Sequence, residues 1–146
     1  MDFFIEFLSN LQRLLAEGSF VSTYKYALLL ALADLAVEKG RDDTSALELR
    51  VEDIANKFVE YYWEHCRPFI GMSGSRRSQL LQNAGTQAKI LSLLSEAYER
   101  SGGKLAALER DARASRELRR NVSSVVRQMP LWKLQTIGRE TRDFLY

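Results

Sequence analysis

The residues of this chain that could do chemistry begin with His65 and Cys66, its only histidine and its only cysteine. Such a pair would suit a metal site, or a thiol nucleophile with a base beside it. Adjacent residues on a helix point about 100° apart, however, and a zinc site takes four ligands. We therefore expect no metal, no cofactor and no catalytic role here, and interpret Cys66 as a small buried hydrophobic residue near a helix end.

Arginine residues offer a second kind of chemistry, the binding of phosphate groups. On the predicted helix 104–128, one face about 80° wide carries Arg113, Arg116, Arg120, Ser123 and Arg127. The opposite side carries Leu118, Val122, Val125, Val126 and Met129. Guanidinium groups three and four residues apart suit a nucleic-acid backbone, because each presents a fork of donors and their summed field attracts a polyanion. The alternative is a solvated face that Glu109 and Glu117 partly neutralise.

The segment 71–78, Gly-Met-Ser-Gly-Ser-Arg-Arg-Ser, could add Arg76 and Arg77 to such a site. Its backbone N–H groups could bind a phosphate as anion-binding nests do, although the segment matches no Walker motif. Because glycine and serine are first of all loop formers, a plain flexible connection is the other interpretation. The aromatic residues at 61–63 could stack bases, but we expect them in the core, where their helix must fill its inner face.

Helices are the main elements that would position these side chains. Apolar periodicity and helix-ending residues predict helices over about 3–17, 24–37, 53–66, 86–100, 104–128 and 138–146. Alternation over Leu47–Val51 predicts a short strand, with 131–136 as a second strand beside it. The order helix, strand, helix loosely resembles a winged-helix opening. The prediction is a mainly α, single helical domain of about six helices with a small two-stranded β element.

The segment 22–38 is apolar almost all round, whereas a surface helix has one apolar stripe. Its apolar residues divide between two opposite sides, with Tyr24, Leu28, Leu32 and Leu35 on one and Leu29, Leu30, Ala33 and Val37 on the other. We therefore expect Tyr24–Val37 to be the buried central helix, wrapped by the others.

Composition narrows the class of protein without choosing a function. A chain of 146 residues with 46% hydrophobic and 27% charged residues fits one domain, 1–146, that folds without disulfides or metal. A single cysteine fits a reducing cytoplasm, and the longest apolar run, 26–33, is far shorter than the roughly 20 residues of a membrane span. The net charge of +2 permits a polyanionic partner without demanding one. The apolar end 144–146 suggests the N-terminal part of a longer protein.

Three patches carry a resemblance to a known family. They read Ser-Thr-Tyr-Lys-Tyr-Ala-Leu-Leu at 22–29 with Ala-Asp-Leu at 33–35, Tyr-Trp at 62–63 with Arg-Pro-Phe at 67–69, and Pro-Leu-Trp-Lys-Leu-Gln at 130–135. Together they resemble the N-terminal region of bacterial HNH endonuclease-like proteins of the restriction or defence type. In that family paired histidines and an asparagine surround a divalent metal downstream of a helical region. A chain with one histidine cannot supply that motif, so the resemblance implies a non-catalytic part of a DNA-directed protein.

The hypothesis from the sequence is DNA binding for a nuclease-type protein. Non-specific phosphate contacts would come from Arg113, Arg116, Arg120 and Arg127, with Arg76 and Arg77 as auxiliaries. A downstream catalytic domain and a second copy of the chain are further partners that fit this view. The alternative is a helical protein-interaction or dimerisation module that binds no nucleic acid. A continuous, solvent-facing arginine face would favour the first hypothesis, and an exposed apolar patch would favour the second.

Overall fold

Helices make up most of the computed structural model, which describes residues 9, 12–13, 23–40, 47–70, 77–78, 89–128, 136–137 and 140–141. The helices are α2 (Tyr24–Lys39), α3 (Val51–Trp63), the 3₁₀ helix η1 (Glu64–Cys66), α4 (Lys89–Arg100), α5 (Leu105–Arg110) and α6 (Ala112–Gln128). Two antiparallel pairs of very short strands are β1 (Phe69–Ile70) with β2 (Arg77–Ser78), and β3 (Thr136–Ile137) with β4 (Glu140–Thr141). The mainly helical fold predicted from the sequence is confirmed.

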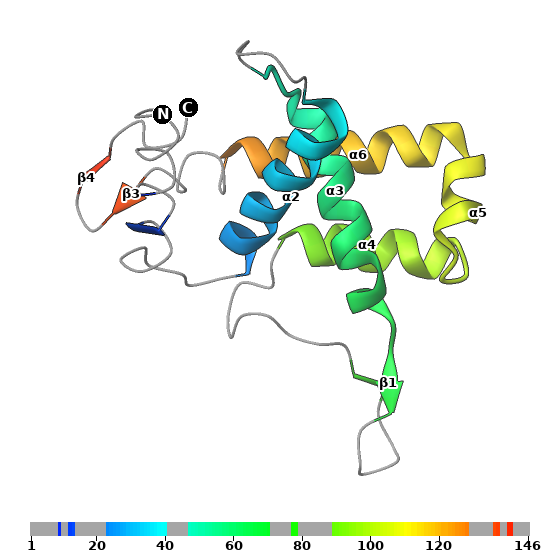
Figure 1. Ribbon diagram of the computed structural model, residues 1–146. Helices are drawn as coiled ribbons and strands as arrows, with labels where there is room; N and C mark the ends of the chain where they lie inside the picture. The colour runs from blue at the N-terminus through cyan, green and yellow to red at the C-terminus, as the bar shows by residue number, and fades with distance from the viewer. Residues whose placement is uncertain are drawn as a thin grey trace.

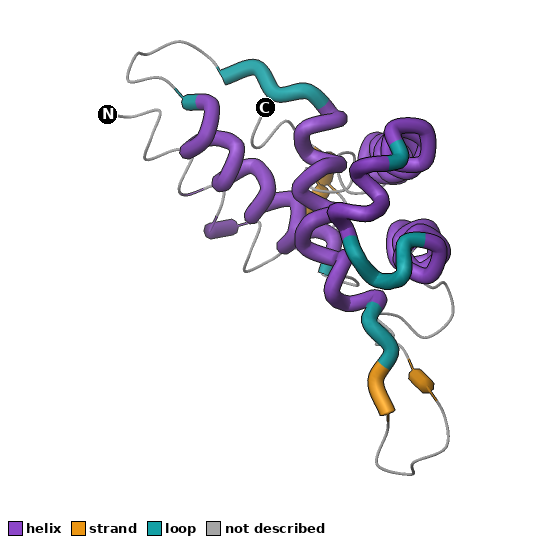
Figure 2. Tube along the Cα trace, turned by 90° about the vertical axis from the view of Figure 1, so that its right-hand side faces the viewer, coloured by secondary structure: helices purple, strands orange, loops and turns teal. Residues whose placement is uncertain are grey.

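Helix α3 is the element that joins the others. It contacts α2 on one side and α4 and α6 on the other, and Figure 1 shows α4 and α6 running side by side behind it. The same two helices are seen nearly end-on in Figure 2. The large side chains of Phe58, Tyr62 and Trp63 are buried at this crossing, with Ile54 and Val59 beside them. These side chains need contacts on several sides, which places α3 at the centre.

Helix α2 is not the wrapped central helix that its composition predicts. One side is buried against α3, through Tyr24, Ala27, Leu28, Ala31 and Leu35. On the opposite side, Tyr26 is 52% exposed, Leu30 51% and Val37 87%. Apolar residues on two sides of a helix therefore indicate one core contact here, and the described elements leave the second side open to solvent.

Tyr24 fixes α2 to its neighbours. Its ring packs edge-on against Phe58, with the ring centroids 5.9 Å apart. Its hydroxyl accepts a hydrogen bond of 3.1 Å from the backbone N–H of Ile90 at the start of α4. Next to it, the hydroxyls of Thr23 and Tyr62 are hydrogen-bonded at 2.6 Å. One corner of the core thus joins α2, α3 and α4.

The predicted strand Leu47–Val51 is wrong. Residues 47–50 form an irregular segment and Val51 begins α3. The acidic first turn of α3 explains the difference, because the Asp53 carboxylate accepts a hydrogen bond from the backbone N–H of Arg50 and so favours a helix start at this point. Without a strand between the two helices, the winged-helix opening is not formed.

The C-terminal predictions fall mostly outside the described residues. Of the predicted strand 131–136, only Thr136 is described, and it belongs to β3, which pairs with β4. The predicted helix 138–146 is wrong at Glu140–Thr141, which form β4. The predicted first helix, 3–17, is described only at Ser9, Gln12 and Arg13, all helical and exposed.

The predicted helix 104–128 is divided in two at Asp111. This residue leaves helical geometry at φ −86° and ψ 89°. Its carboxylate accepts hydrogen bonds from the backbone N–H groups of Arg113 (3.1 Å) and Ala114 (3.0 Å), which caps the first turn of α6. The break lets α5 fold back against α6. Earlier in the chain, α4 is followed by Gly102 and Gly103, whose φ angles of 63° and 78° are positive and favour glycine.

Candidate nucleic-acid interface

Helix α6 has one apolar side and one basic side, as its sequence predicts. Leu118, Val122, Val125 and Val126 are buried, and α6 contacts both α3 and α4. Met129 lies outside the described residues. Burial of the valine side leaves Arg116, Arg120 and Arg127 exposed on the outside. The core contacts of α6 therefore set the direction in which these arginines point.

The exposed arginines form one wall of an open groove between α3 and α6. The groove has a volume of about 680 Å³. Its lining from α6 consists of Arg116, Arg119, Arg120, Ser123, Ser124, Arg127 and Gln128, and its lining from α3 consists of Glu52 and Asn56. We call it the arginine groove. Its described ionisable lining residues are four arginines and one carboxylate.

The three exposed arginines of the groove are available to a ligand. Within the described part of the chain, Arg116, Arg120 and Arg127 form no ion pair. The Nε of Arg116 donates to the backbone oxygen of Ala112 at 3.0 Å, which keeps its stem along the helix. Arg113 is also exposed but lies before the groove and does not line it.

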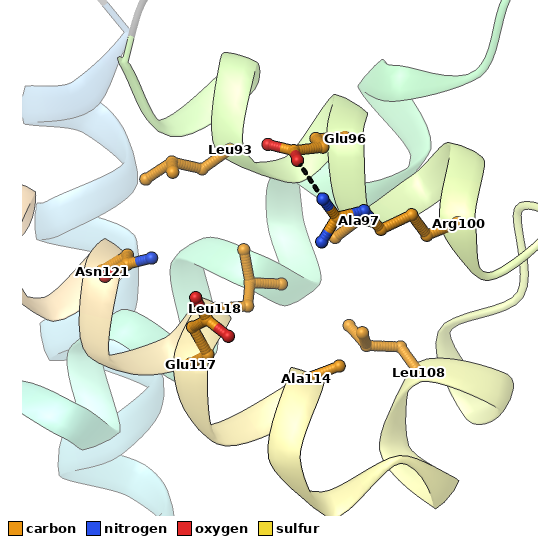
Figure 3. Close-up of a pocket in the computed structure, with 9 residues that line it drawn as sticks. All are labelled: Leu93, Glu96, Ala97, Arg100, Leu108, Ala114, Glu117, Leu118 and Asn121. Carbon is orange, nitrogen blue, oxygen red and sulfur yellow. Dashed lines mark hydrogen bonds and ion pairs between the residues drawn. The ribbon is translucent and has the colours of Figure 1, made fainter.

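The two glutamates expected to neutralise the arginine face do not reach it. Glu109 instead pairs with Arg119, at 3.2 Å between the carboxylate and Nη2. Glu117 lines a different cleft, of about 170 Å³, between α4, α5 and α6. Figure 3 shows this cleft, where the Glu96–Arg100 ion pair lies across from Glu117 and Asn121 over a floor of Leu93, Leu108 and Leu118. Glu109 therefore offsets the charge of Arg119 alone, and within the described residues neither glutamate pairs with Arg116, Arg120 or Arg127.

Arg119 is the groove residue that sequence reasoning missed. It lies just outside the predicted arc, and its guanidinium donates to the side-chain oxygen of Asn56 and to Glu109. Asn56 and Glu52 belong to α3, whose approach depends on tertiary packing and leaves no signal in the sequence near α6. These contacts hold Arg119 between α3, α5 and α6, so it supports the groove wall and is less free to bind a ligand.

Ser123 lies on the predicted face but is not exposed. It lines the groove and is only 6% exposed, because it lies at the edge of the predicted arc, next to the side of α6 that packs in the core. Its Oγ is the buried side-chain polar atom, among those the structure describes, that has no hydrogen-bond partner. The predicted arginine face thus has one buried edge, at Ser123, and exposed arginines over the rest of the arc.

The two auxiliary arginines are not brought to the groove by any described contact. Arg76 lies outside the described residues. Arg77 belongs to β2, where it pairs with Ile70 of β1. Figure 1 shows β1 beyond the C-terminal end of α3, whereas Glu52 and Asn56 lie in the N-terminal half of that helix.

His65 and Cys66 point to different partners. His65 Nδ1 lies 3.0 Å from the backbone oxygen of Tyr61, and the Cys66 thiol donates to the backbone oxygen of Tyr62 at 3.5 Å. Burial raises the pKa of the Cys66 thiol, which disfavours a reactive thiolate. In the described part of the chain, no group of three or more His, Cys, Asp or Glu side chains could hold a metal ion.

The chain belongs to the family described as domain of unknown function DUF8808, whose model matches residues 5–144. No curated protein and no solved structure matches it. The family description names no activity, so the resemblance to HNH endonuclease-like proteins stays a prediction. Among the helices that the structure describes, none is long and apolar enough to span a membrane.

Proposed function

We propose that this chain binds the phosphate backbone of DNA in the arginine groove. The observation that carries the proposal is the set of exposed arginines, Arg116, Arg120 and Arg127, which line one groove and form no ion pair within the described residues. We further propose that the chain is the non-catalytic part of a nuclease-type protein, which rests on the three sequence patches alone.

Phosphate binding would follow from the chemistry of the groove. Each guanidinium is permanently charged and can donate two parallel hydrogen bonds to one phosphate. Binding would also release counterions from the nucleic acid, so affinity should fall steeply as salt concentration rises. Backbone contacts of this kind position a protein on DNA and carry no base sequence. We therefore expect sequence-independent binding.

The test replaces the two groove arginines that are one helical turn apart. The Arg116→Ala/Arg120→Ala variant should bind a DNA duplex more weakly, and the slope of log affinity against log salt should fall by about 2, because two phosphate contacts are lost. Fluorescence anisotropy at several salt concentrations measures both quantities.

The matched control removes the same amount of positive charge from another part of the surface. Arg100→Ala/Arg110→Ala removes two exposed arginines that do not line the groove. It should leave the salt slope near that of the unmodified protein. An equal loss in both variants would attribute binding to overall charge, and unchanged binding in the groove variant would remove the arginine groove from the proposal.

A second candidate function is self-association through the exposed side of α2. The exposed residues Tyr26, Leu30, Ala33 and Val37 are spaced four, three and four positions apart. This symmetric spacing lets two antiparallel copies of α2 place Leu30 of each against Ala33 of the other, as a two-fold interface requires. The alternative function, a dimerisation module, would use this face.

Light scattering coupled to size-exclusion chromatography tests the second candidate. The unmodified chain should approach twice its 16.8 kDa mass as its concentration rises. Leu30→Glu should return it to the monomer mass, because a buried carboxylate without a partner disfavours the interface. A monomer at every concentration, or a dimer that Leu30→Glu leaves intact, would exclude this face.

A further inference from the structure

We infer that the arginine groove takes a nucleic-acid duplex in preference to an unpaired strand. This inference rests on the proposed function and specifies which form of nucleic acid the groove binds. It is carried by two features of the groove, the kinds of side chain that line it and the rigidity of the helix that presents the arginines.

Stacking platforms are missing from the part of the lining that the structure describes. Proteins that bind unpaired strands combine a basic groove with aromatic side chains on which bases stack. Among the described lining residues of this groove there is no aromatic side chain. The aromatic residues nearest in the sequence of α3 are used in the core, since Phe58, Tyr62 and Trp63 are each at most 3% exposed. Along this described lining, an unpaired strand would find charge and no surface for its bases.

The remaining aromatic side chains of α3 and α4 are also engaged elsewhere. The Tyr61 hydroxyl donates to the Asp34 carboxylate on α2. Tyr98 packs against Trp63, with ring centroids 5.3 Å apart, and touches the turn at Gly103. Recruiting any of these rings to bind a base would break a contact within the protein. The groove is consequently suited to a ligand that shows its backbone and keeps its bases paired.

The arginines also lie along a fixed straight line. Arg116 and Arg127 are eleven residues apart on α6, which corresponds to roughly 16 Å along the helix axis. The buried valines on the other side of α6 hold this line in place. Duplex DNA is stiff over such a distance and carries one phosphate charge per about 1.7 Å of its axis. An unpaired strand has a lower charge density and would lose conformational freedom on being straightened.

Uncharged donors in the groove fit the same ligand. Ser124 and Gln128 line the groove beside Arg127, with Gln128 Nε2 3.5 Å from Ser124 Oγ. Hydroxyl and amide side chains commonly add to arginine contacts on phosphate oxygens. Glu52, in contrast, lies on the opposite wall and would repel a phosphate backbone. The groove therefore accepts phosphates mainly along α6.

The experiment compares two forms of one labelled oligonucleotide. A fluorescein-labelled 24-nucleotide strand of unstructured sequence is titrated with the 146-residue chain, alone and after annealing to its complement. We expect the duplex to bind on the order of 10-fold more tightly and with a steeper salt dependence. Equal or tighter binding of the single strand would overturn the inference and leave the proposed function intact. Binding of neither form would overturn the proposed function itself.

A charge-removing variant locates the duplex. Glu52→Gln should strengthen duplex binding by a few-fold, because it removes the one carboxylate among the described lining residues. Glu64→Gln, an exposed site in η1 just past the far end of α3, is the matched control and should change duplex binding less. Equal effects of the two variants would place the duplex outside the groove and overturn the inference.

Discussion

The outward sides of α6 and α2 differ in how well water solvates them. Both helices are backed by α3. The outward side of α6 carries arginines, which water solvates at little cost, whereas the outward side of α2 carries Leu30 and Val37, which water solvates poorly. The α6 surface is stable in water without a ligand, whereas covering the α2 surface removes apolar side chains from water and is favourable. The two surfaces therefore call for partners of different chemistry, a distinction that the net charge of +2 conceals.

Destabilising α3, which packs against both α2 and α6, should disrupt both surfaces together. Phe58 is fully buried in α3 between the two faces. Phe58→Ala should lower the free energy of unfolding by about 3–5 kcal/mol, through lost burial and the cavity that remains. Urea denaturation followed by circular dichroism measures this change. Val37→Ala is the control at an 87% exposed site, and should change stability by less than about 0.5 kcal/mol. Similar losses in the two variants would contradict the central position of α3.

Raising the pH should lower the stability of the fold through Tyr24 and Tyr61, while the arginines of α6 keep their charge. Burial raises the pKa of the Tyr24 hydroxyl, and burial together with the hydrogen bond to Asp34 raises the pKa of Tyr61. Both groups keep their protons in the folded chain at a pH where the unfolded chain releases them, near 10. Their contribution to stability is thus complete below pH 10 and is lost as the pH rises further.

Urea denaturation between pH 8 and pH 11 tests this dependence. The free energy of unfolding should fall above pH 10, and the Tyr24→Phe/Tyr61→Phe variant should show a shallower fall from a lower starting value. DNA binding by the arginine groove should stay flat between pH 6 and pH 9, because guanidinium groups do not titrate there. A stability that rises above pH 10, or an equally steep fall in the variant, would contradict the assignment to these tyrosines.

The sequence predicts these two surfaces unequally well, for reasons that individual residues show. Of the five apolar positions predicted on this helix, the four that the structure describes, Leu118, Val122, Val125 and Val126, are all buried, because periodicity is reliable on a long amphipathic helix. The break at Asp111 is invisible to periodicity, since a single side-chain cap ends one helix and starts the next. On α2, apolar residues lie on two sides of the helix, and the sequence alone does not show which side packs against the core.

The groove itself is only half visible in the sequence. One wall follows from the spacing of Arg116, Arg120 and Arg127, which local helix geometry determines. The other wall, Glu52 and Asn56, comes from a helix more than 50 residues away in sequence and depends on how α3 crosses α6. The burial of Ser123, at the edge of the arc, also depends on how the helices pack, so a pattern on one helix could not predict it.

Arg119 should behave unlike the other arginines of the groove. Arg119→Ala removes hydrogen bonds to Asn56 and Glu109 and should lower the free energy of unfolding by about 1 kcal/mol. Arg116→Ala should change stability by less than about 0.5 kcal/mol, because its guanidinium forms no ion pair within the described residues. Denaturation and DNA-binding measurements on both variants would separate support from ligand contact. Equal effects on stability would contradict the supporting role of Arg119.

The smallest expected change is a gain in stability at Ser123, the buried edge of the arginine face. Ser123 Oγ is buried without a hydrogen-bond partner among the described residues, so Ser123→Ala removes an unsatisfied polar group and adds a better helix former. The free energy of unfolding should rise by roughly 0.5–1 kcal/mol in urea denaturation, with DNA affinity unchanged. Ser124→Ala, at the neighbouring exposed position, is the control and should give a smaller change in stability. A loss of stability in Ser123→Ala would show that the hydroxyl is hydrogen-bonded in solution, and a loss of DNA affinity alone would show that the ligand reaches the floor of the groove.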